Sequence, residues 1–304
     1  MTNPRSEAQA GETTPMSYYG RPVIKAPTWR WYVGAYLFMG GLAGASAPML
    51  LASRATRNAS LARASLAAAL AGVVVSPVLL IADLRDPRRF LHMLRVFKVT
   101  SPMSVGSWIL TVFGTSVAVA AVGEFVGFAK PVGRIAEALA AMTGPALATY
   151  TAALLADTAV PIWHDARREL PFVFAGGALA SGASCALVFV PVADAKLARR
   201  LAATGMILEF ASLELMTRRL GPLVGEPYTM GRAGTLKYIA RAASIASLAA
   251  LARARNDRVF AAASGILGLA GAACERFSIF EAGKASANDP KYTVDPQRKR
   301  LAER

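Results

Sequence analysis

Eight mostly apolar runs, separated by short loops rich in arginine, divide this chain of 304 residues. A helix needs roughly 20 apolar residues to cross the hydrocarbon core of a bilayer, which is close to the length of these runs. In lipid only helices and closed barrels satisfy the backbone hydrogen bonds, and uninterrupted apolar runs do not suit the alternating strands of a barrel. The sequence therefore predicts an all-α integral membrane protein with eight transmembrane helices. The predicted spans are Val33–Ala52, Ser65–Ala82, Trp108–Phe128, Thr143–Ile162, Pro171–Val192, Leu201–Met216, Tyr238–Ala252 and Val259–Ala273.

The last two predicted spans are short and rich in alanine, and Arg241 lies inside the seventh. Six spans with two helices at the membrane surface is therefore the alternative count. Small residues are dense in the first and fifth spans, which indicates close packing between helices. They include Gly40, Gly41, Gly44, Gly176 and Gly177.

The net charge of +15 is explained by the loops of a membrane protein. Lys and Arg lie between the apolar runs, and no patch interleaves aromatic and basic side chains, so we expect no nucleic-acid partner. Eight spans place both termini on one side, and 23 of the 34 Lys and Arg residues lie on that side. The positive-inside rule then predicts cytoplasmic termini in a multi-pass protein of the cell's inner membrane. The polar first 30 residues do not have the pattern of a signal peptide.

The chain is not expected to carry a redox centre or a metal site of its own. Cys185 and Cys274 lie in or at the end of apolar runs, and an iron–sulfur cluster needs four ligands. His92 lies in a loop and His164 just after a span, so the two are not placed to face each other as axial ligands of a haem.

Ionisable residues within the spans are candidates for function, because a charge at the bilayer centre costs about 2.5–3.5 kcal/mol on insertion scales. Asp83 ends the second span, and Asp157 lies near the same membrane face. Tyr150 and Glu209 are expected about mid-membrane, and Glu124 toward the opposite face. A proton path through Asp157, Glu124 and Glu209 is one hypothesis. Structural ion pairs are the alternative, with Arg218, Arg219 or Arg241 as partners of the acids on the sixth span.

Several segments carry specific motifs, the clearest of which is Thr-Ser-Pro-Met-Ser at residues 100–104. The segments are Tyr18–Lys25, Trp29 with Gly41–Gly44, Asp83–Phe90, Leu94–Trp108, Tyr150–Trp163 and Phe280–Tyr292. In this order they resemble the NrfD/polysulphide reductase membrane-subunit family, and the resemblance covers nearly the whole chain. Two stretches depart from the family pattern. Asp83–Pro87 reads Asp-Leu-Arg-Asp-Pro rather than Asp-Leu-Gly-Arg-Pro, and Val33–Leu37 is apolar where some members carry Asn and His.

The resemblance implies a fold of two four-helix bundles, with residues 33–164 forming the first and residues 165–280 the second. Residues 1–32 and 281–304 are then extramembrane. It also implies a membrane subunit that exchanges electrons between the quinone pool and a docked iron–sulfur subunit. A molybdopterin-type catalytic subunit often completes such complexes. The quinone pocket of the family lies in the first bundle, near the docking face.

Carried over by position, the resemblance predicts a quinone site. Quinone chemistry moves two electrons and two protons, so the site needs hydrogen-bond partners and proton carriers. We expect Asp83 to handle protons and Tyr150 to bind a quinone carbonyl. Further quinone-binding candidates are His92, Ser101, Ser104, Trp108 and Tyr36. The residues predicted to dock the iron–sulfur subunit are Tyr18, Tyr19, Arg21, Lys25, Arg95, Lys98 and Lys284.

Three other functions stay open at this point. The first is a non-catalytic membrane anchor for the other subunits. The second is a quinone-coupled subunit that also translocates protons, and the third is a transporter without redox chemistry. Transporters tend to show inverted repeats and helices broken near the midplane, and this sequence shows no convincing matched pair of breaks. The aromatic residues Trp29, Trp31, Tyr32 and Trp108 also suit a plain interfacial belt.

Overall fold

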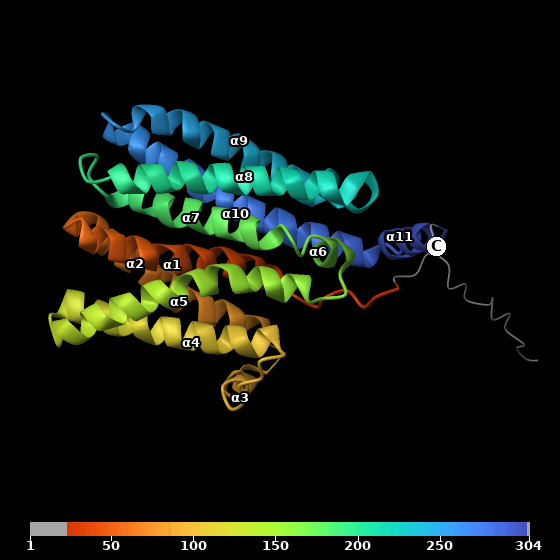
Figure 1. Cartoon of the computed structure of the whole chain (residues 1–304), viewed down its shortest axis with the longest axis horizontal. Helices are drawn as coiled ribbons and strands as arrows, with labels where there is room; N and C mark the ends of the chain where they lie inside the picture. The colour runs from red at the N-terminus through yellow and green to blue at the C-terminus, as the bar shows by residue number, and fades with distance from the viewer. Residues whose placement is uncertain (1–22, 85, 303–304) are drawn as a thin grey trace, which may run out of the picture.

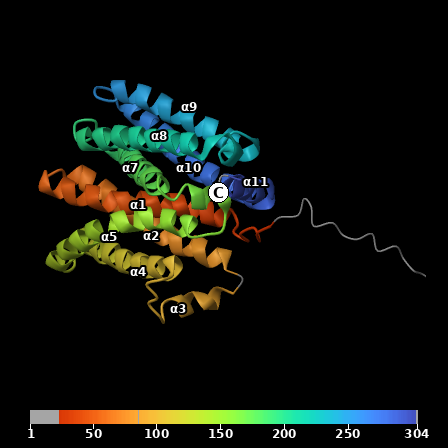
Figure 2. The ribbon, with the colours of Figure 1, turned by 45° about the vertical axis from the view of Figure 1, so that its right-hand side comes forward.

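The computed structural model describes residues 23–84 and 86–302, and within them it contains helices and no strand. Eight of the helices have 20 or more residues and lie lengthwise beside one another (Figure 1, Figure 2). They are α1 (Trp31–Ala55), α2 (Ala59–Asp83), α4 (Pro102–Ala121), α5 (Lys130–Ala156), α7 (Leu170–Phe189), α8 (Lys196–Val224), α9 (Gly231–Arg253) and α10 (Arg258–Asn288).

The long helices lie in two groups. Figure 1 shows α1, α2, α4 and α5 together below α7, α8, α9 and α10. Helix α1 packs against α2 and α5 of its own group and against α7 of the other, so it lies at the seam between them. A Cβ added at Gly44 of α1 would come within 2.5 Å of the carbonyl oxygen of Gly144 in α5. The structure therefore confirms that small residues allow close packing of these helices.

Within the described residues, six helices are long and apolar enough to cross a membrane: α1, α2, α4 with the π-helical segment η2 (Val122–Val126), α5, α7 and α10. This is the composition of a multi-pass membrane protein. The predicted spans Leu201–Met216 and Tyr238–Ala252 form α8 and α9, which are as long but carry more charge. Both run alongside the apolar helices rather than across their ends (Figure 1, Figure 2).

The predicted fourth span, Thr143–Ile162, is misplaced. Helix α5 begins at Lys130 and ends at Ala156, and a short helix α6 (Pro161–Asp165) follows it. Charged residues near the start of α5 made this part of the sequence resemble a loop. In the structure these charges are neutralised by ion pairs, so they are compatible with a helix in this position. As a result Tyr150 lies six residues, about 9 Å at 1.5 Å per residue, from the C-terminal end of α5, whereas the predicted span placed it nearer the middle of its helix.

Short helices gather at one end of the molecule. In Figure 1, α6 and α11 (Lys291–Ala302) lie on the right beside the start of α1, and α3 (Phe90–Met93) lies below α4 at the bottom of the view. Two 3-10 turns, η1 (Pro87–Arg89) and η3 (Glu226–Tyr228), complete the connections.

The helix that contains the last predicted span runs further than predicted. Helix α10 continues from the predicted span at 259–273 to Asn288, so the segment predicted as a tail at 281–304 begins inside a helix. Gly283 of α10 leaves room for the ring of Trp163. The indole Nε1 of Trp163 donates a hydrogen bond to the carbonyl oxygen of Ile279 at 2.9 Å. This packing holds the end of α10 against α6.

Candidate functional site

A cavity of about 120 Å³ lies between the ends of α1, α2, α4 and α5, close to α3. Its polar side chains come from four helices and are Tyr36, Asp83, Ser107 and Tyr150. Most of the remaining wall is apolar, with Val33, Leu80, Met103 and Leu154 among its residues. The structure therefore brings together the two residues predicted to be catalytic, Asp83 and Tyr150, with the predicted quinone ligand Tyr36.

Two tyrosine hydroxyls meet at this cavity. The hydroxyl groups of Tyr36 on α1 and Tyr150 on α5 share a hydrogen bond. Tyr36 is 1 % exposed. Gly106 of α4 faces the ring of Tyr150, and a Cβ at this position would collide with that ring. The glycine of the Thr100–Trp108 motif therefore has a physical reason, since it makes room for the phenol.

Asp83 is the last residue of α2. Its Oδ1 accepts a hydrogen bond from the backbone N–H of Arg30 at 3.0 Å. Arg30 is the residue that precedes the first turn of α1. The bond thus ties the entry of α1 to the end of α2 and fixes the carboxylate at the mouth of the cavity.

Tyr150 also faces a second, more open hollow of about 550 Å³ at the same end of the molecule. Asp157, His164, Arg167 and Thr100 line this hollow. The imidazole Nδ1 of His164 lies 3.1 Å from the carbonyl oxygen of Ala156. Tyr150 thus separates the cavity from a polar hollow that contains a carboxylate and an imidazole, the residue types that carry protons.

Four predicted quinone ligands lie outside the cavity. Ser101 caps α4, and its Oγ accepts from the backbone N–H of Ser104 at 3.4 Å. The Oγ of Ser104 bonds the backbone of Lys98 and Val96, both at 3.0 Å, so the two serines shape the loop. The other two candidates, His92 and Trp108, do not line the cavity either.

Trp108 packs its ring edge-to-face on Phe97, with ring centroids 6.2 Å apart, in an apolar hollow on another side of α4. His92 lies exposed on α3. Sequence reasoning missed the cavity residues Met103 and Ser107, which lie four residues apart on α4. It also did not assign His164 to the site. The i, i+4 spacing of residues on one helix face is the signal that identifies Met103 and Ser107.

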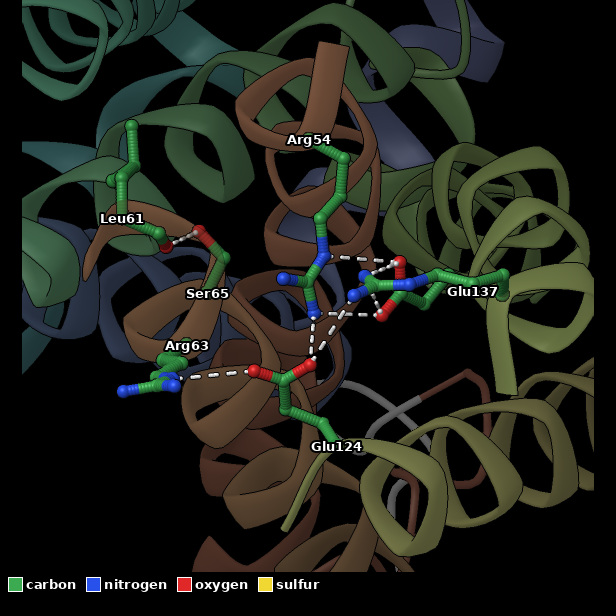
Figure 3. Close-up of polar contacts among 7 residues, drawn as sticks. Arg54, Leu61, Arg63, Ser65, Glu124 and Glu137 are labelled. Atoms are coloured by element: carbon green, nitrogen blue, oxygen red, sulfur yellow. Dashed lines mark hydrogen bonds and ion pairs between the residues drawn. The ribbon is translucent and has the colours of Figure 1, made fainter. Parts of the chain in front are cut away.

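The three residues of the hypothetical proton path lie far from one another in the fold. Glu124 of η2 lies in an ion-pair cluster at the end opposite the cavity (Figure 3). The Arg54 guanidinium is 2.6 Å from the Glu124 carboxylate and 2.9 Å from that of Glu137, and Arg63 reaches Glu124 at 3.2 Å. Arg134 bonds Glu137 at 3.0 Å. We call these five residues the arginine clasp.

Asp157 lies in the hollow beside Tyr150. Glu209, near the middle of α8, is buried in the other group of helices. Two of the three arginines considered as partners for the acids of this helix pair with one of them, Glu214, and the third pairs with an acid outside the helix. Arg218 and Arg241 bind Glu214 at 2.9 and 2.7 Å, and Arg219 binds Glu169 at 2.5 Å.

The predicted docking residues are only partly described. Tyr18, Tyr19 and Arg21 lie outside the described residues. Lys25, Arg95 and Lys98 are exposed at the end of the molecule that carries α3. The ammonium of Lys284 lies 5.4 Å from the centre of the Phe280 ring.

Comparison with known protein families identifies a family that matches most of the chain. Residues 23–240 match the family described as polysulphide reductase, NrfD. The matched range runs from the segment before α1 to the middle of α9 and includes every residue of the cavity. A search of curated proteins gave no significant match. NrfD proteins are membrane subunits of quinone-interacting oxidoreductase complexes. The match covers well over half of the chain, and the chain belongs to the NrfD family.

Proposed function

We propose that this chain is the quinone-reactive membrane subunit of an oxidoreductase complex, and that it exchanges electrons between the quinone pool and a docked iron–sulfur subunit. The observation that carries the proposal is the cavity in which Tyr36, Tyr150 and Asp83 meet. A molybdopterin-type catalytic subunit completes the complex in this proposal. The chain lies in the inner membrane with cytoplasmic termini.

The cavity suits the head group of a quinone. Apolar side chains such as Val33, Leu80 and Leu154 form walls for a flat, apolar ring. Polar groups are few and converge from different helices, which is the usual make-up of a small-molecule site. Tyr150 and Ser107 are positioned to bind carbonyl or hydroxyl oxygens of the ring, and Asp83 lies at the mouth.

Proton handling follows from the same residues. A bound quinone supplies the two-electron, two-proton chemistry. In this proposal the Tyr150 hydroxyl donates a hydrogen bond to a quinone oxygen. It also relays a proton between that oxygen and the Tyr36 hydroxyl, to which it is hydrogen-bonded. Asp83 takes up or releases the second proton at the mouth of the cavity. Asp157 and His164, in the hollow beyond Tyr150, connect this end of the site to water.

The partner docks at the end of the molecule that carries α3, α6 and α11. The cavity lies between the ends of α1, α2, α4 and α5 near this end, so the iron–sulfur cluster of a docked subunit comes close to the quinone. Lys25, Arg95 and Lys98 offer positive charge there. Exposed apolar residues beside them, including Val96 and Val99, offer contact area. An acidic partner surface suits this combination.

Two substitutions test the quinone site. Tyr150→Phe removes one hydroxyl, and we expect quinol-linked electron transfer in the complex to slow about tenfold, as for a lost hydrogen bond of about 1.4 kcal/mol. Asp83→Asn removes a proton carrier and is expected to slow it by about a hundredfold.

The matched control is Thr149→Val, which removes a neighbouring hydroxyl that bonds only within its own helix at 2.8 Å. It should leave the rate unchanged. If both Tyr150→Phe and Asp83→Asn kept the wild-type rate of quinol-linked electron transfer, the proposed quinone site would be wrong. The chain would then act only as a membrane anchor.

A further inference from the structure

The second group of helices holds a cluster of buried charges that the quinone site does not use. Glu209 of α8, Lys237 of α9, and Glu275 and Arg276 of α10 are 5 %, 7 %, 3 % and 1 % exposed. Burying charges this deeply is costly unless they are paired and hydrogen-bonded. We call these four residues the buried charge cluster.

Helix α7 is shaped to admit the cluster. A Cβ added at Gly177 would meet the Glu209 carboxylate and would lie 2.8 Å from Nη2 of Arg276. Nη2 of Arg276 donates to the carbonyl oxygen of Phe174 at 2.6 Å, and its guanidinium lies 3.9 Å from the centre of the Phe174 ring. The arginine is therefore held in place from α7, while the two acids face it from α8 and α10.

Several polar atoms in and beside the cluster lack a hydrogen-bond partner within the described part of the chain. They are Oε1 of Glu209, Oε1 of Glu275, Nη1 of Arg276 and the hydroxyl of Tyr228. A buried polar group left unpaired costs about 1–3 kcal/mol, and an unpaired carboxylate costs more. Buried acids in such surroundings reduce the cost by taking up a proton.

An open cleft leads toward the cluster from the end of the molecule that carries α11. The cleft has a volume of about 620 Å³, and Lys237, Arg241, Glu214 and Glu226 are among its lining residues. Lys237 also lies 5.9 Å from the centre of the Tyr228 ring. Because Lys237 belongs both to the cleft wall and to the cluster, it links the two.

We propose that Glu209 and Glu275 form a proton-binding site that exchanges protons with the cleft through Lys237. In this step one proton moves from the ammonium of Lys237 to a carboxylate oxygen of Glu209 or Glu275. The products are a neutral amine and a carboxylic acid, and no group is oxidised or reduced. The two acids and two cations of the cluster sum to zero charge before and after this transfer. The cleft then returns a proton to Lys237.

The groups that face the two acids come from several elements. They are Tyr228 of η3, Lys237 and Arg241 of α9, and Arg276 of α10. The Phe174 carbonyl of α7 binds Arg276, and Glu214 of α8 acts on Lys237 rather than on the two acids. Glu275 and Arg276 lie beyond residue 240, outside the range that matches NrfD. The site lies in the group of helices that does not form the quinone cavity, so either proposal can fail alone.

Infrared spectroscopy of the full-length chain in lipid nanodiscs tests the proposal. The carbonyl-stretch band of protonated carboxylic acids is followed as the pH is changed and after transfer to D₂O. We expect a pH-dependent band in the wild type that both Glu209→Gln and Glu275→Gln reduce. Glu214→Gln is the matched control, because this acid is ion-paired at the surface, and it should keep the band.

A second measurement does not depend on the folding of the Gln variants. Lys237→Met should slow hydrogen–deuterium exchange of the acid band at least tenfold while the band itself stays. A wild-type spectrum that neither Gln variant changes would overturn the proton-binding site. An exchange rate that Lys237→Met leaves unchanged would overturn the route through the cleft.

Discussion

At the scale of single residues, Gly106 determines where the Tyr150 phenol lies. Alanine at this position places a methyl group in the tyrosine ring. We expect Gly106→Ala to displace the Tyr150 hydroxyl from Tyr36 and to slow quinol-linked electron transfer about tenfold, as Tyr150→Phe does. Gly114→Ala on the same helix is the control, since the added carbon lies 3.3 Å from Cγ1 of Val73, and a shift of this side chain by a few tenths of an ångström accommodates it. Equal rates in the two variants would contradict the role given to Gly106.

The family resemblance, carried over by position, predicted Tyr36, Asp83 and Tyr150 as site residues, and the structure places these three at one cavity. On α4 the cavity is lined by other residues than the predicted ones, because the sequence does not tell which face a side chain occupies. Successive residues on a helix are about 100° apart, so Ser107 lines the cavity while Trp108 packs on Phe97. A sequence without the packing partner does not specify that rotation.

At the scale of elements, the arginine clasp joins α1, α2, η2 and α5 at the end opposite the cavity. Arg54→Leu leaves the nearly buried Glu137 and Glu124 short of a partner. We expect it to lower the free energy of unfolding by about 3 kcal/mol, the lower end for breaking a buried pair, since Arg134 still binds Glu137. Arg63→Leu, which removes only an exposed arm, should cost less than about 1 kcal/mol. Unfolding of the purified chain in mixed detergent micelles measures both, and equal losses would contradict this ranking.

Helix α11 is held to η3 by an ionised carboxylate. Glu226 accepts hydrogen bonds from the Lys291 ammonium at 2.7 Å and the Tyr292 hydroxyl at 2.9 Å. The bond from Lys291 holds the pKa of Glu226 below its usual range. The attachment is therefore complete above the usual glutamate pKa and is lost as the pH falls through the lowered value.

We expect spin labels at positions 229 and 293 to show one narrow distance distribution at neutral pH and a broad one at about pH 3. Glu226→Gln should give a broader distribution at neutral pH and abolish its dependence on acid. A distribution that neither change affects would show that α11 is held by other contacts.

The limits of helices were predicted less well than their existence. Six of the eight predicted spans lie in the six apolar helices of the described residues. Length and apolarity suffice to identify such a lipid-crossing segment. The start of α5 was missed because Arg134 and Glu137 resemble loop charges until their ion pairs are seen. The end of α10 was missed for a related reason, since Glu275 and Arg276 are charged yet buried.

At the scale of the whole molecule, the path of α8 and α9 decides how many times the chain crosses the membrane. Both lie alongside α7 and α10 over their length, and we infer that they cross with them (Figure 1, Figure 2). Eight crossings put Thr229, between the two helices, on the same side as the C-terminus. Six crossings put it with Asn256, in the loop before α10.

Cysteine labelling in sealed vesicles distinguishes these arrangements. We expect a membrane-impermeant maleimide to label Thr229→Cys and Thr293→Cys from the same side of the membrane. Asn256→Cys should be labelled from the opposite side. The labelling variants also carry Cys185→Ala and Cys274→Ala, which removes the two native thiols. Joint labelling of positions 229 and 256 from one side would show six crossings.

Helix α10 has 31 residues, which is about 46 Å at 1.5 Å per residue. The hydrocarbon core of a bilayer is only about 30 Å thick. We infer that the excess, roughly three turns, extends beyond the hydrocarbon core as a rigid post at the end braced by the Trp163 indole. The height of that post sets the stand-off between the lipid surface and whatever protein rests on α11, so the spacing is built into the length of one continuous helix.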